Sequence, residues 1–263
     1  MSQLLIFDHA ILVVDNLNQA QKDFQSLGFT VFYGGKHADG KTENCLIVFQ
    51  DGSYIELIGL IEQTALDDPD GMHARLFGPG EGWVGYALLS HDLEQDIQSM
   101  RRRGLSVTDP QDNSRARPDG KTVAWRAATL ENAMIPFFLE DRTLRSLRVP
   151  DDERRIHANG VSGVARVVVG VPQLEEAVEQ YEKILGQSAV KSTLNLPDTS
   201  AFDFPQQTAT LTLAAPINKR SVLRDQVTER GSSIYMLRLY SHRHEALLDL
   251  QRTHSARIEL VNL

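Results

Sequence analysis

The chain is organised around the apolar stretch FDHAILVV, residues 7–14, and the later stretch DGSYIELI, residues 51–58. Each stretch is typical of a buried β-strand, and each carries a side chain that can bind a metal or transfer a proton, His9 or Glu56, where an apolar residue is expected. Because side chains alternate between the two faces of a strand, His9 and Glu56 each share a face with apolar neighbours. If those two faces line one cavity, His9 and Glu56 form a site.

The bulk composition is that of an ordinary globular protein, with 263 residues, 41% hydrophobic and 24% charged. The formal net charge of −8 argues against a nucleic-acid partner, which requires a basic surface. The single cysteine, Cys45, lies in an apolar run, so we expect a buried thiol and no internal disulfide. No apolar run could span a bilayer and no signal peptide is evident, so we expect a cytoplasmic protein with no membrane partner.

The chain repeats one order of elements, strand–helix–strand–strand–strand. In the first copy we expect a helix after the first strand, a glycine-rich loop at 34–40, and strands at 6–14, 29–33, 44–49 and 54–60. Adding 76 to the residue numbers maps this copy onto a second one, and adding 157 maps it onto a third. In the second copy we expect strands at 84–89, 105–107, 121–128 and 135–139, and in the third at 164–171, 201–204 and 208–214.

A fourth, truncated copy ends the chain, with strands expected at 234–240 and 256–261 and a helix at 242–251. One copy alone cannot bury both faces of its sheet, so the copies should pair. We therefore expect a first domain at 1–143, a linker at 144–160 and a second domain at 161–263. The predicted fold class is α+β, with paired units forming curved, cup-like mixed sheets and helices outside. The truncated copy leaves a sheet edge uncovered, which a homodimer would cover.

Several short segments extend this pattern: FDH (7–9), GFTV (28–31), GGKH (34–37), KTEN (41–44), DGSYIELI (51–58), RARPDG (115–120), Trp125 and IPFF (135–138). Together with the paired units, they resemble the glyoxalase-like domain family of the vicinal oxygen chelate superfamily. That superfamily includes glyoxalase I, extradiol dioxygenases and bleomycin-resistance proteins. The resemblance covers residues 5 to about 172. It implies the fold, whereas the reaction can be of isomerase, lyase or dioxygenase type, or absent.

The resemblance also implies a divalent metal held by His and Glu side chains from a first and a fourth strand. His9 and Glu56 match those positions, and imidazole and carboxylate ligands suit Fe, Mn, Ni, Co or Zn. Tight binding needs a third ligand, for which His37 is the nearest candidate. The second copy contributes none, because Gly85 stands in the register of His9 and the IPFF strand has no carboxylate.

Each candidate also has a purely structural interpretation. A buried histidine can satisfy itself by hydrogen bonds within a sheet, so a structural role for His9 stands beside metal ligation. A carboxylate among apolar strand residues carries a desolvation cost of roughly several kcal/mol, which favours a functional role for Glu56. We expect burial to raise the pKa of Glu56 toward neutrality, as suits a general base.

Arg115 and Arg117 are two residues apart and would share a strand face. Arginine forks bind carboxylates and phosphates, so the pair predicts an anion clamp at the mouth of the cup, although both could instead be solvated on an edge strand. Asn44 is a candidate to hydrogen-bond a substrate after the glycine-rich loop. Trp125 could form a wall of the substrate pocket or pack in the core.

Two functional hypotheses follow from these residues. The first is an enzyme that acts on a small oxygenated or anionic metabolite, in which His9 and Glu56 bind a metal or Glu56 transfers a proton. The second is a metal-free protein that binds and sequesters a small molecule, as bleomycin-resistance proteins do.

Overall fold

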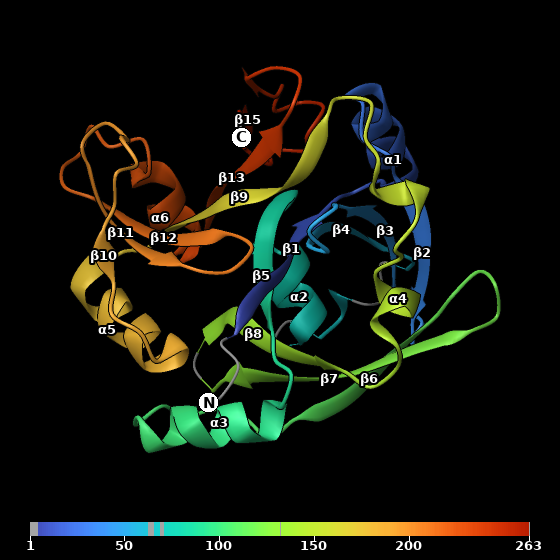
Figure 1. Cartoon of the computed structure of the whole chain (residues 1–263), viewed down its shortest axis with the longest axis horizontal. Helices are drawn as coiled ribbons and strands as arrows, with labels where there is room; N and C mark the ends of the chain where they lie inside the picture. Colours follow the sequence, from blue (N-terminus) through green and yellow to red (C-terminus); the bar gives the residue numbers. More distant parts are fainter. Residues whose placement is uncertain (1–4, 63–65, 69–70, 132, 263) are drawn as a thin grey trace.

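The computed structural model describes residues 5–62, 66–68, 71–131 and 133–262 and arranges them in two β-sheets (Figure 1). The strands of the first sheet are β1 (Ile6–Val13), β2 (Phe32–His37), β3 (Thr42–Val48), β4 (Tyr54–Leu60), β5 (Gly82–Leu89), β6 (Gln111–Ala116), β7 (Thr122–Leu130) and β8 (Ala133–Asp141). Those of the second sheet are β9 (Val161–Gly170), β10 (Val190–Lys191), β11 (Thr199–Pro205), β12 (Thr210–Pro216), β13 (Ser233–Ser241), β14 (Ala246–Leu247) and β15 (Ile258–Val261). The helices are α1 (Leu17–Ser26), α2 (Met72–Phe77), α3 (Leu93–Arg102), α4 (Arg145–Arg148), α5 (Leu174–Leu185), α6 (Arg224–Arg230) and the short 3₁₀ helix η2 (Glu153–Arg155).

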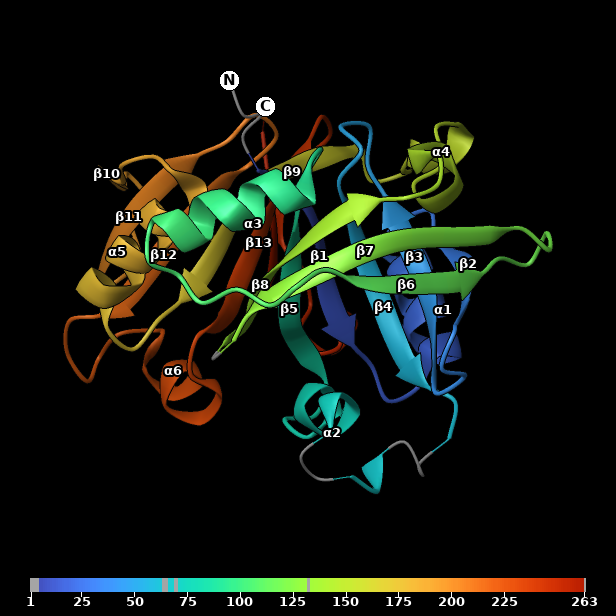
Figure 2. The same cartoon turned by 90° about the horizontal axis from the view of Figure 1, so that it is seen from below.

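The first two repeats close into a barrel with the strand order β1-β4-β3-β2-β6-β7-β8-β5. Within each repeat the first and fourth strands pair in parallel, β1 with β4 and β5 with β8. Figure 2 shows α3 across the outside of the barrel, with α2 and α4 at its opposite ends. The predicted α+β class, with cup-like mixed sheets and helices outside, is confirmed.

Alternation along the strands separates the interior of the barrel from its outer core. On β4, Ile55 and Leu57 are fully buried in the large apolar core that also holds Phe24 of α1. Tyr54 and Glu56 point the other way, into the barrel. The large core continues into the second sheet, so helices and sheets pack around one apolar cluster.

Strand β2 corrects two expectations, because it starts at Phe32 and includes residues predicted to be a loop. A Cβ at Gly34 would lie 2.2 Å from Asn44 Oδ1, and a Cβ at Gly35 would lie 1.9 Å from the carbonyl oxygen of Ala116. The glycines therefore permit a close approach of β2 to β3 and β6, with a bulge between Tyr33 and Gly35. In the sequence alone, the same glycines indicate a loop.

Strand β6 is the second departure from expectation. Residues 105–107, predicted to be a strand, contribute only an isolated bridge from Val107 to Leu130. The second strand of this repeat is Gln111–Ala116, which is largely exposed. Its polar sequence lacks the apolar alternation on which strand prediction depends.

The second sheet has the order β10-β11-β12-β9-β13-β15-β14 and does not close. The helix predicted at 242–251 is wrong, because this segment contains the short strand β14 and turns. The Ser241 hydroxyl accepts hydrogen bonds from the backbone N–H groups of Arg243 and His244, and the Asp249 carboxylate accepts one from Gln251. Such side chain-to-backbone bonds compete with a helix.

The connection between the sheets packs against the barrel. His157 Nε2 contacts the carbonyl oxygen of Val48 at 3.1 Å, and the backbone N–H of Thr30 donates to His157 Nδ1 at 2.9 Å. Burial lowers the pKa of His157 to about 4, so this histidine is neutral. A first domain at 1–143, a linker at 144–160 and a second domain at 161–263 are the boundaries that we propose.

Candidate functional site

His9 and Glu56 meet inside the barrel because β1 and β4 pair in parallel. The register aligns His9 with Tyr54 and Ile11 with Glu56, so His9 and Glu56 are diagonal neighbours on one face. His9 Nε2 lies 3.3 Å from Glu56 Oε2. Glu56 is 7% exposed and His9 2% exposed, so the pair is almost excluded from water.

Two further candidates contact the other oxygen of Glu56. Asn44 Nδ2 donates a hydrogen bond to Glu56 Oε1 at 2.5 Å, and His37 Nε2 lies 3.5 Å from the same oxygen. His37 Nδ1 lies 2.8 Å from the Thr42 hydroxyl, which orients the ring. The structure thus brings His9, His37 and Asn44 together around one carboxylate.

Asp8 orients His9 from behind. A register shift between Phe7 and His9 marks a bulge at Asp8, and the buried Asp8 carboxylate lies 2.7 Å from His9 Nδ1. Two arginines of α4 hold Asp8 in turn, with Arg148 Nη1 and Arg145 Nη2 each 2.7 Å from a carboxylate oxygen. These guanidinium charges and the hydrogen bond from His9 overcome burial and hold the pKa of Asp8 well below its usual range.

The contacts of His9 determine its protonation. An ionised Asp8 only accepts, so Nδ1 of His9 carries a proton, and Nε2 then faces a second carboxylate. Burial alone would lower the pKa of His9, but the hydrogen bonds and charges of Asp8 and Glu56 together raise it. The structure therefore favours an imidazolium between two carboxylates.

The expected rise in the pKa of Glu56 is wrong. Burial does act to raise it, but hydrogen bonds from His37 and His9, together with their charges, hold it well below its usual value. The sequence indicated the burial of Glu56 and not the donors that converge on it. Glu56 is accordingly a carboxylate.

Arg115 lies at the narrow seam where the two repeats join. Strands β2 and β6 pair over two positions only, and one of them aligns His37 with Arg115. Arg115 is 3% exposed and its guanidinium donates to the carbonyl oxygen of Gly34. Among the residues that the structure describes, no carboxylate lies within ion-pair distance of Arg115, although the charge of Glu56 acts on it.

The other two candidates are only partly associated with this cluster. Arg117 binds the Asp119 carboxylate at 3.0 Å and the carbonyl oxygen of Leu147, so its fork is occupied in the turn after β6. Trp125 of β7 is half-buried, and its ring meets the His37 ring edge-on with centroids 6.4 Å apart. The predicted arginine pair is therefore divided, with Arg115 alone beside Glu56.

The second repeat contributes an aromatic ring that contacts His9. Phe137 of β8 stands in the register of Glu56, and its ring lies edge-on to that of His9 with centroids 5.5 Å apart. The Tyr54 ring stacks on that of His9 with centroids 4.4 Å apart. Gly85 stands at the position that corresponds to His9, so neither of the two positions in the second repeat carries a side chain that could bind a metal.

The donors are of the right kind for a divalent metal, because two imidazoles and one carboxylate suit several transition metals. Their arrangement does not fit one. His9 and His37 contact different oxygens of Glu56 instead of converging on one point. Across the described ranges, no group of three or more His, Cys, Asp or Glu residues could hold a metal ion.

Sequence reasoning missed the residues that support the site, above all Asp8, Arg145 and Arg148. The adjacent polar residues Asp8 and His9 interrupt the alternation of an apolar strand, which is a signal of a bulge. The two arginines lie three apart in a segment predicted to be a linker. Only the tertiary structure shows that both reach Asp8.

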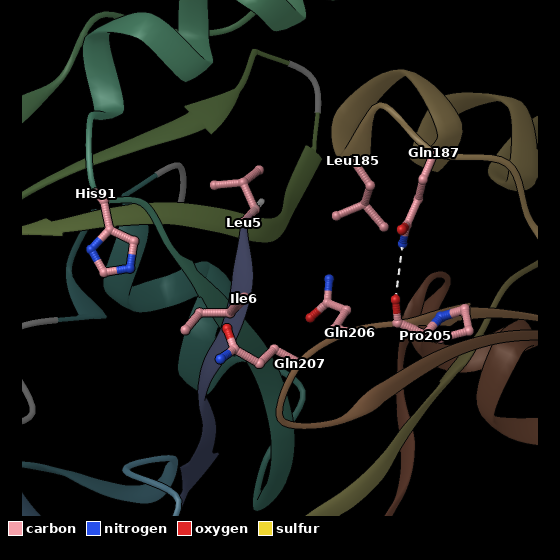
Figure 3. Close-up of a pocket in the computed structure, with 8 residues that line it drawn as sticks. All are labelled: Leu5, Ile6, His91, Leu185, Gln187, Pro205, Gln206 and Gln207. Carbon is pink, nitrogen blue, oxygen red and sulfur yellow. Dashed lines mark hydrogen bonds between the residues drawn. The ribbon is translucent and has the colours of Figure 1, made fainter. Parts of the chain in front are cut away.

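A small pocket lies elsewhere, between β1 and the loops of the second sheet (Figure 3). It encloses about 150 Å³ and contains none of the candidate residues. The side-chain oxygen of Gln206 accepts a hydrogen bond from the Phe7 N–H at 2.9 Å, and Gln187 donates to the carbonyl oxygen of Pro205 at 3.3 Å. The first of these bonds joins the barrel to the second sheet, and the second lies within the part of the chain that forms the second sheet.

Comparisons with known proteins agree with this architecture. A hypothetical protein from Staphylococcus aureus is similar over 99% of this chain and 100% of its own, with 16% identity and a TM-score of 0.77. A mutant of 4-hydroxymandelate synthase from Streptomyces coelicolor is similar over 91% and 71%, with 14% identity and a TM-score of 0.62. A fusion of a xylose isomerase-like TIM barrel with 4-hydroxyphenylpyruvate dioxygenase is similar over 91% and 37%, with 17% identity and a TM-score of 0.56. At these identities the likeness shows the fold alone.

In sequence, no curated protein matches the chain. No helix among the described residues is long and apolar enough to cross a membrane. The family model of the glyoxalase-like domain matches residues 7–185, which include both repeats of the barrel. The chain therefore belongs to the glyoxalase-like domain family, with the fold of the vicinal oxygen chelate superfamily.

Proposed function

We propose that this protein is an enzyme that acts on a small, anionic, oxygenated metabolite within the barrel. Arg115 carries the proposal, because it is a buried guanidinium with no carboxylate partner among the described residues, beside the His9–Glu56 pair. An unpaired buried charge is unfavourable by roughly several kcal/mol, and an anionic substrate group would offset this. A bidentate contact would also fix the orientation of the substrate.

In this proposal His9 and Glu56 move a proton. The carboxylate of Glu56 accepts a proton from the carbon next to a substrate carbonyl, and the imidazolium of His9 donates to the carbonyl oxygen on which the resulting negative charge develops. An anionic substrate beside Glu56 raises its pKa by like-charge repulsion, which brings the carboxyl closer to the range of a general base. The chemistry is that of an isomerase or lyase.

The neighbouring side chains would admit and position the substrate. His37 is partly exposed and lies at the β2–β6 seam, and the half-buried Trp125 of the adjacent strand β7 packs against its ring. The seam is therefore our proposed entrance. Asn44 Oδ1 is buried without a hydrogen-bond partner in the described part of the chain. It is therefore free to accept a hydrogen bond from a substrate hydroxyl.

The test is turnover of a panel of small carboxylated aldehydes, ketones and catechols by wild type and variants. Glu56→Gln should lower kcat by about 10²- to 10⁴-fold and leave binding of the same compounds largely intact. Arg115→Gln should instead raise KM for carboxylated compounds. Arg117→Gln is the matched control, because the fork of Arg117 is already occupied by Asp119. An active protein whose turnover is unaffected by Glu56→Gln would refute the proposal.

We give a divalent metal no role in this step, since the donors do not fit one as they are arranged. Fe, Mn, Ni, Co or Zn at His9, His37 and Glu56 is the alternative. Metal analysis of protein purified without chelator distinguishes a metal-free from a metal-assisted reaction. We expect less than one transition-metal ion per chain. One tightly bound ion per chain would replace proton transfer with metal-assisted chemistry of the isomerase or dioxygenase type.

A second candidate is a metal-free protein that binds a small molecule without transforming it. The observation that favours it is Phe137, whose ring stands against His9 where the second repeat could have supplied a carboxylate. Under this candidate, compounds of the same panel bind, none is turned over, and Glu56→Gln changes affinity alone.

We further propose that the protein works in the cytoplasm, without a nucleic-acid or membrane partner, and that it dimerises through the second sheet. The edge strand β14 ends in the exposed Leu247, and the exposed Leu250 follows three residues later. Mass measurement in solution tests the dimer, and a monomer at all concentrations would exclude it.

A further inference from the structure

The second sheet reuses the unit that builds the site in the barrel, with different side chains. Strands β9 and β12 pair in parallel as β1 and β4 do, and the register aligns Arg166 with Thr210 and Val168 with Thr212. Compared with the pairing of β1 and β4, Arg166 takes the place of His9 and Thr212 that of Glu56. An arginine and a hydroxyl thus replace the imidazolium and the carboxylate.

Arg166 is held by one end of its guanidinium. Nη1 of Arg166 lies 2.5 Å from Asp203 Oδ1 and 2.5 Å from the Thr212 hydroxyl, which itself donates to Asp203. In the described part of the chain, neither Nε nor Nη2 of Arg166 has a hydrogen-bond partner. Three N–H bonds of Arg166 are therefore left to a ligand or to water.

A second arginine stands directly opposite the first. Antiparallel β13 aligns Arg238 with Arg166, and like charges at such a position disfavour the pairing. Arg238 Nε donates to Glu259 Oε2 at 2.6 Å, and its two terminal nitrogens have no partner among the described residues. Each arginine thus has a carboxylate on a strand farther out in the sheet, Asp203 on β11 for Arg166 and Glu259 on β15 for Arg238. Unpaired donors of both arginines remain at one site.

The sheet is hollowed at this position. The hollow holds about 620 Å³ and is lined by Arg166 and Arg238 with Tyr240 and Glu245. Ligand pockets commonly measure about 300–1,000 Å³, so a metabolite of ordinary size fits. The second sheet does not close into a barrel, and this leaves the hollow open to solvent.

We propose that this hollow is a second binding site, which takes a small hydroxylated metabolite through an oxyanion group held between Arg166 and Arg238. Carboxylate and phosphate share the geometry that guanidinium forks recognise. The bound anion also relieves the repulsion between the two facing arginines. Tyr240 and Glu245 supply a donor and an acceptor for the hydroxyl groups of the ligand. This site is distinct from the barrel and does not depend on the function proposed for Glu56.

The test uses the full-length protein with two probes, citrate for the carboxylate and glycerol 3-phosphate for the phosphate. Binding is followed by calorimetry and by the NMR signals of the arginine Nε–H groups. We expect at least one probe to bind and to move the signals of Arg166 and Arg238. Arg238→Gln should weaken binding ~10- to 100-fold, because hydrogen bonds to a charged group are lost.

Three variants make the result decisive. Arg220→Gln removes the same charge from an exposed position that does not line the hollow, and it should leave affinity unchanged. Arg238→Lys keeps the charge but loses the fork, and it should bind more weakly than wild type. Arg115→Gln should leave this binding intact, which separates the hollow from the barrel. The proposal fails if neither probe moves the two arginine signals, or if Arg220→Gln weakens binding as much as Arg238→Gln.

Discussion

The barrel and the second sheet use one structural unit for two kinds of polar network. In the barrel, Arg148, Asp8, His9 and Glu56 form a chain of alternating charges that is almost sealed from water. In the second sheet, the same register carries Arg166, at the side of an open hollow. The difference arises because two complete repeats close around the first network, whereas the truncated fourth repeat leaves the second exposed.

The largest effect should come from replacing Arg148, the buried arginine of α4 that pairs with Asp8. Asp8 and Asp141 share two arginines, and Arg148→Met removes the more buried one, so that Arg145 alone pairs with both carboxylates. Breaking a buried ion pair costs about 3–5 kcal/mol. Arg166→Met in the more open network should cost about 1–3 kcal/mol, as for lost hydrogen bonds to a charged group. Chemical denaturation measures both free energies of unfolding.

Arg148→Lys is the matched control for charge. It should recover part of the stability, because a lysine restores the cation but not the fork that spans Asp8 and Asp141. If Arg148→Met and Arg166→Met lower the free energy of unfolding by the same amount, the proposed contrast between a sealed and an open network is wrong.

A smaller effect is expected where the two repeats of the barrel join. Gly34→Ala places a Cβ 2.2 Å from Asn44 Oδ1 and should destabilise by about 1–3 kcal/mol, as overpacking does. Gly40→Ala, in the turn of the same hairpin, meets no neighbouring atom within 4 Å, and its cost should be limited to about 1 kcal/mol of backbone strain at positive φ. Thermal unfolding of both variants measures whether Gly34→Ala loses more stability than Gly40→Ala, as expected if close packing at the seam causes the loss.

The smallest effect concerns pH. The pKa of His9 is higher in the folded protein than in the unfolded chain, where it is about 6.5. Protonation of His9 therefore contributes fully to the free energy of unfolding below about pH 6.5, and this contribution is lost as pH rises through the pKa of the folded protein. A tenfold difference in proton affinity between the folded and unfolded chains corresponds to about 1.4 kcal/mol of stability. The free energy of unfolding, measured by denaturation between about pH 6.5 and 9, should therefore fall with rising pH.

His9→Gln should remove most of that slope, and Arg238→Gln should not. Below about pH 6.5 the trend reverses, because the pKa of His157 is lowered to about 4 and its stabilising effect is lost as pH falls toward that value. The lowered pKa values of Asp8 and Glu56 add to the loss in acid. An unchanged slope in His9→Gln would mean that His9 is neutral in the folded protein.

Much of the fold could be predicted because it depends on local patterns. Apolar alternation located β1, β4 and β5. The helix expected after β1 is present, and Asn16 caps it, since Asn16 Oδ1 accepts from the Gln19 N–H. The polar strand β6 and the turns at 242–251 could not be predicted, because neither has apolar periodicity. The glycines at 34 and 35 gave the wrong prediction, since close approach and loop formation require the same residue.

The sequence by itself determined the repeat, the fold class and the presence of an ionisable residue on each of two strands of the barrel. These follow from periodicities that one strand or helix carries alone. The tertiary structure decided the charges at the site. Parallel pairing of β1 and β4 brings His9 to Glu56, and the return of α4 places Arg145 and Arg148 on Asp8. A pKa depends on partners that lie far apart in the chain, so the lowered pKa of Glu56 could only be seen once the barrel had closed.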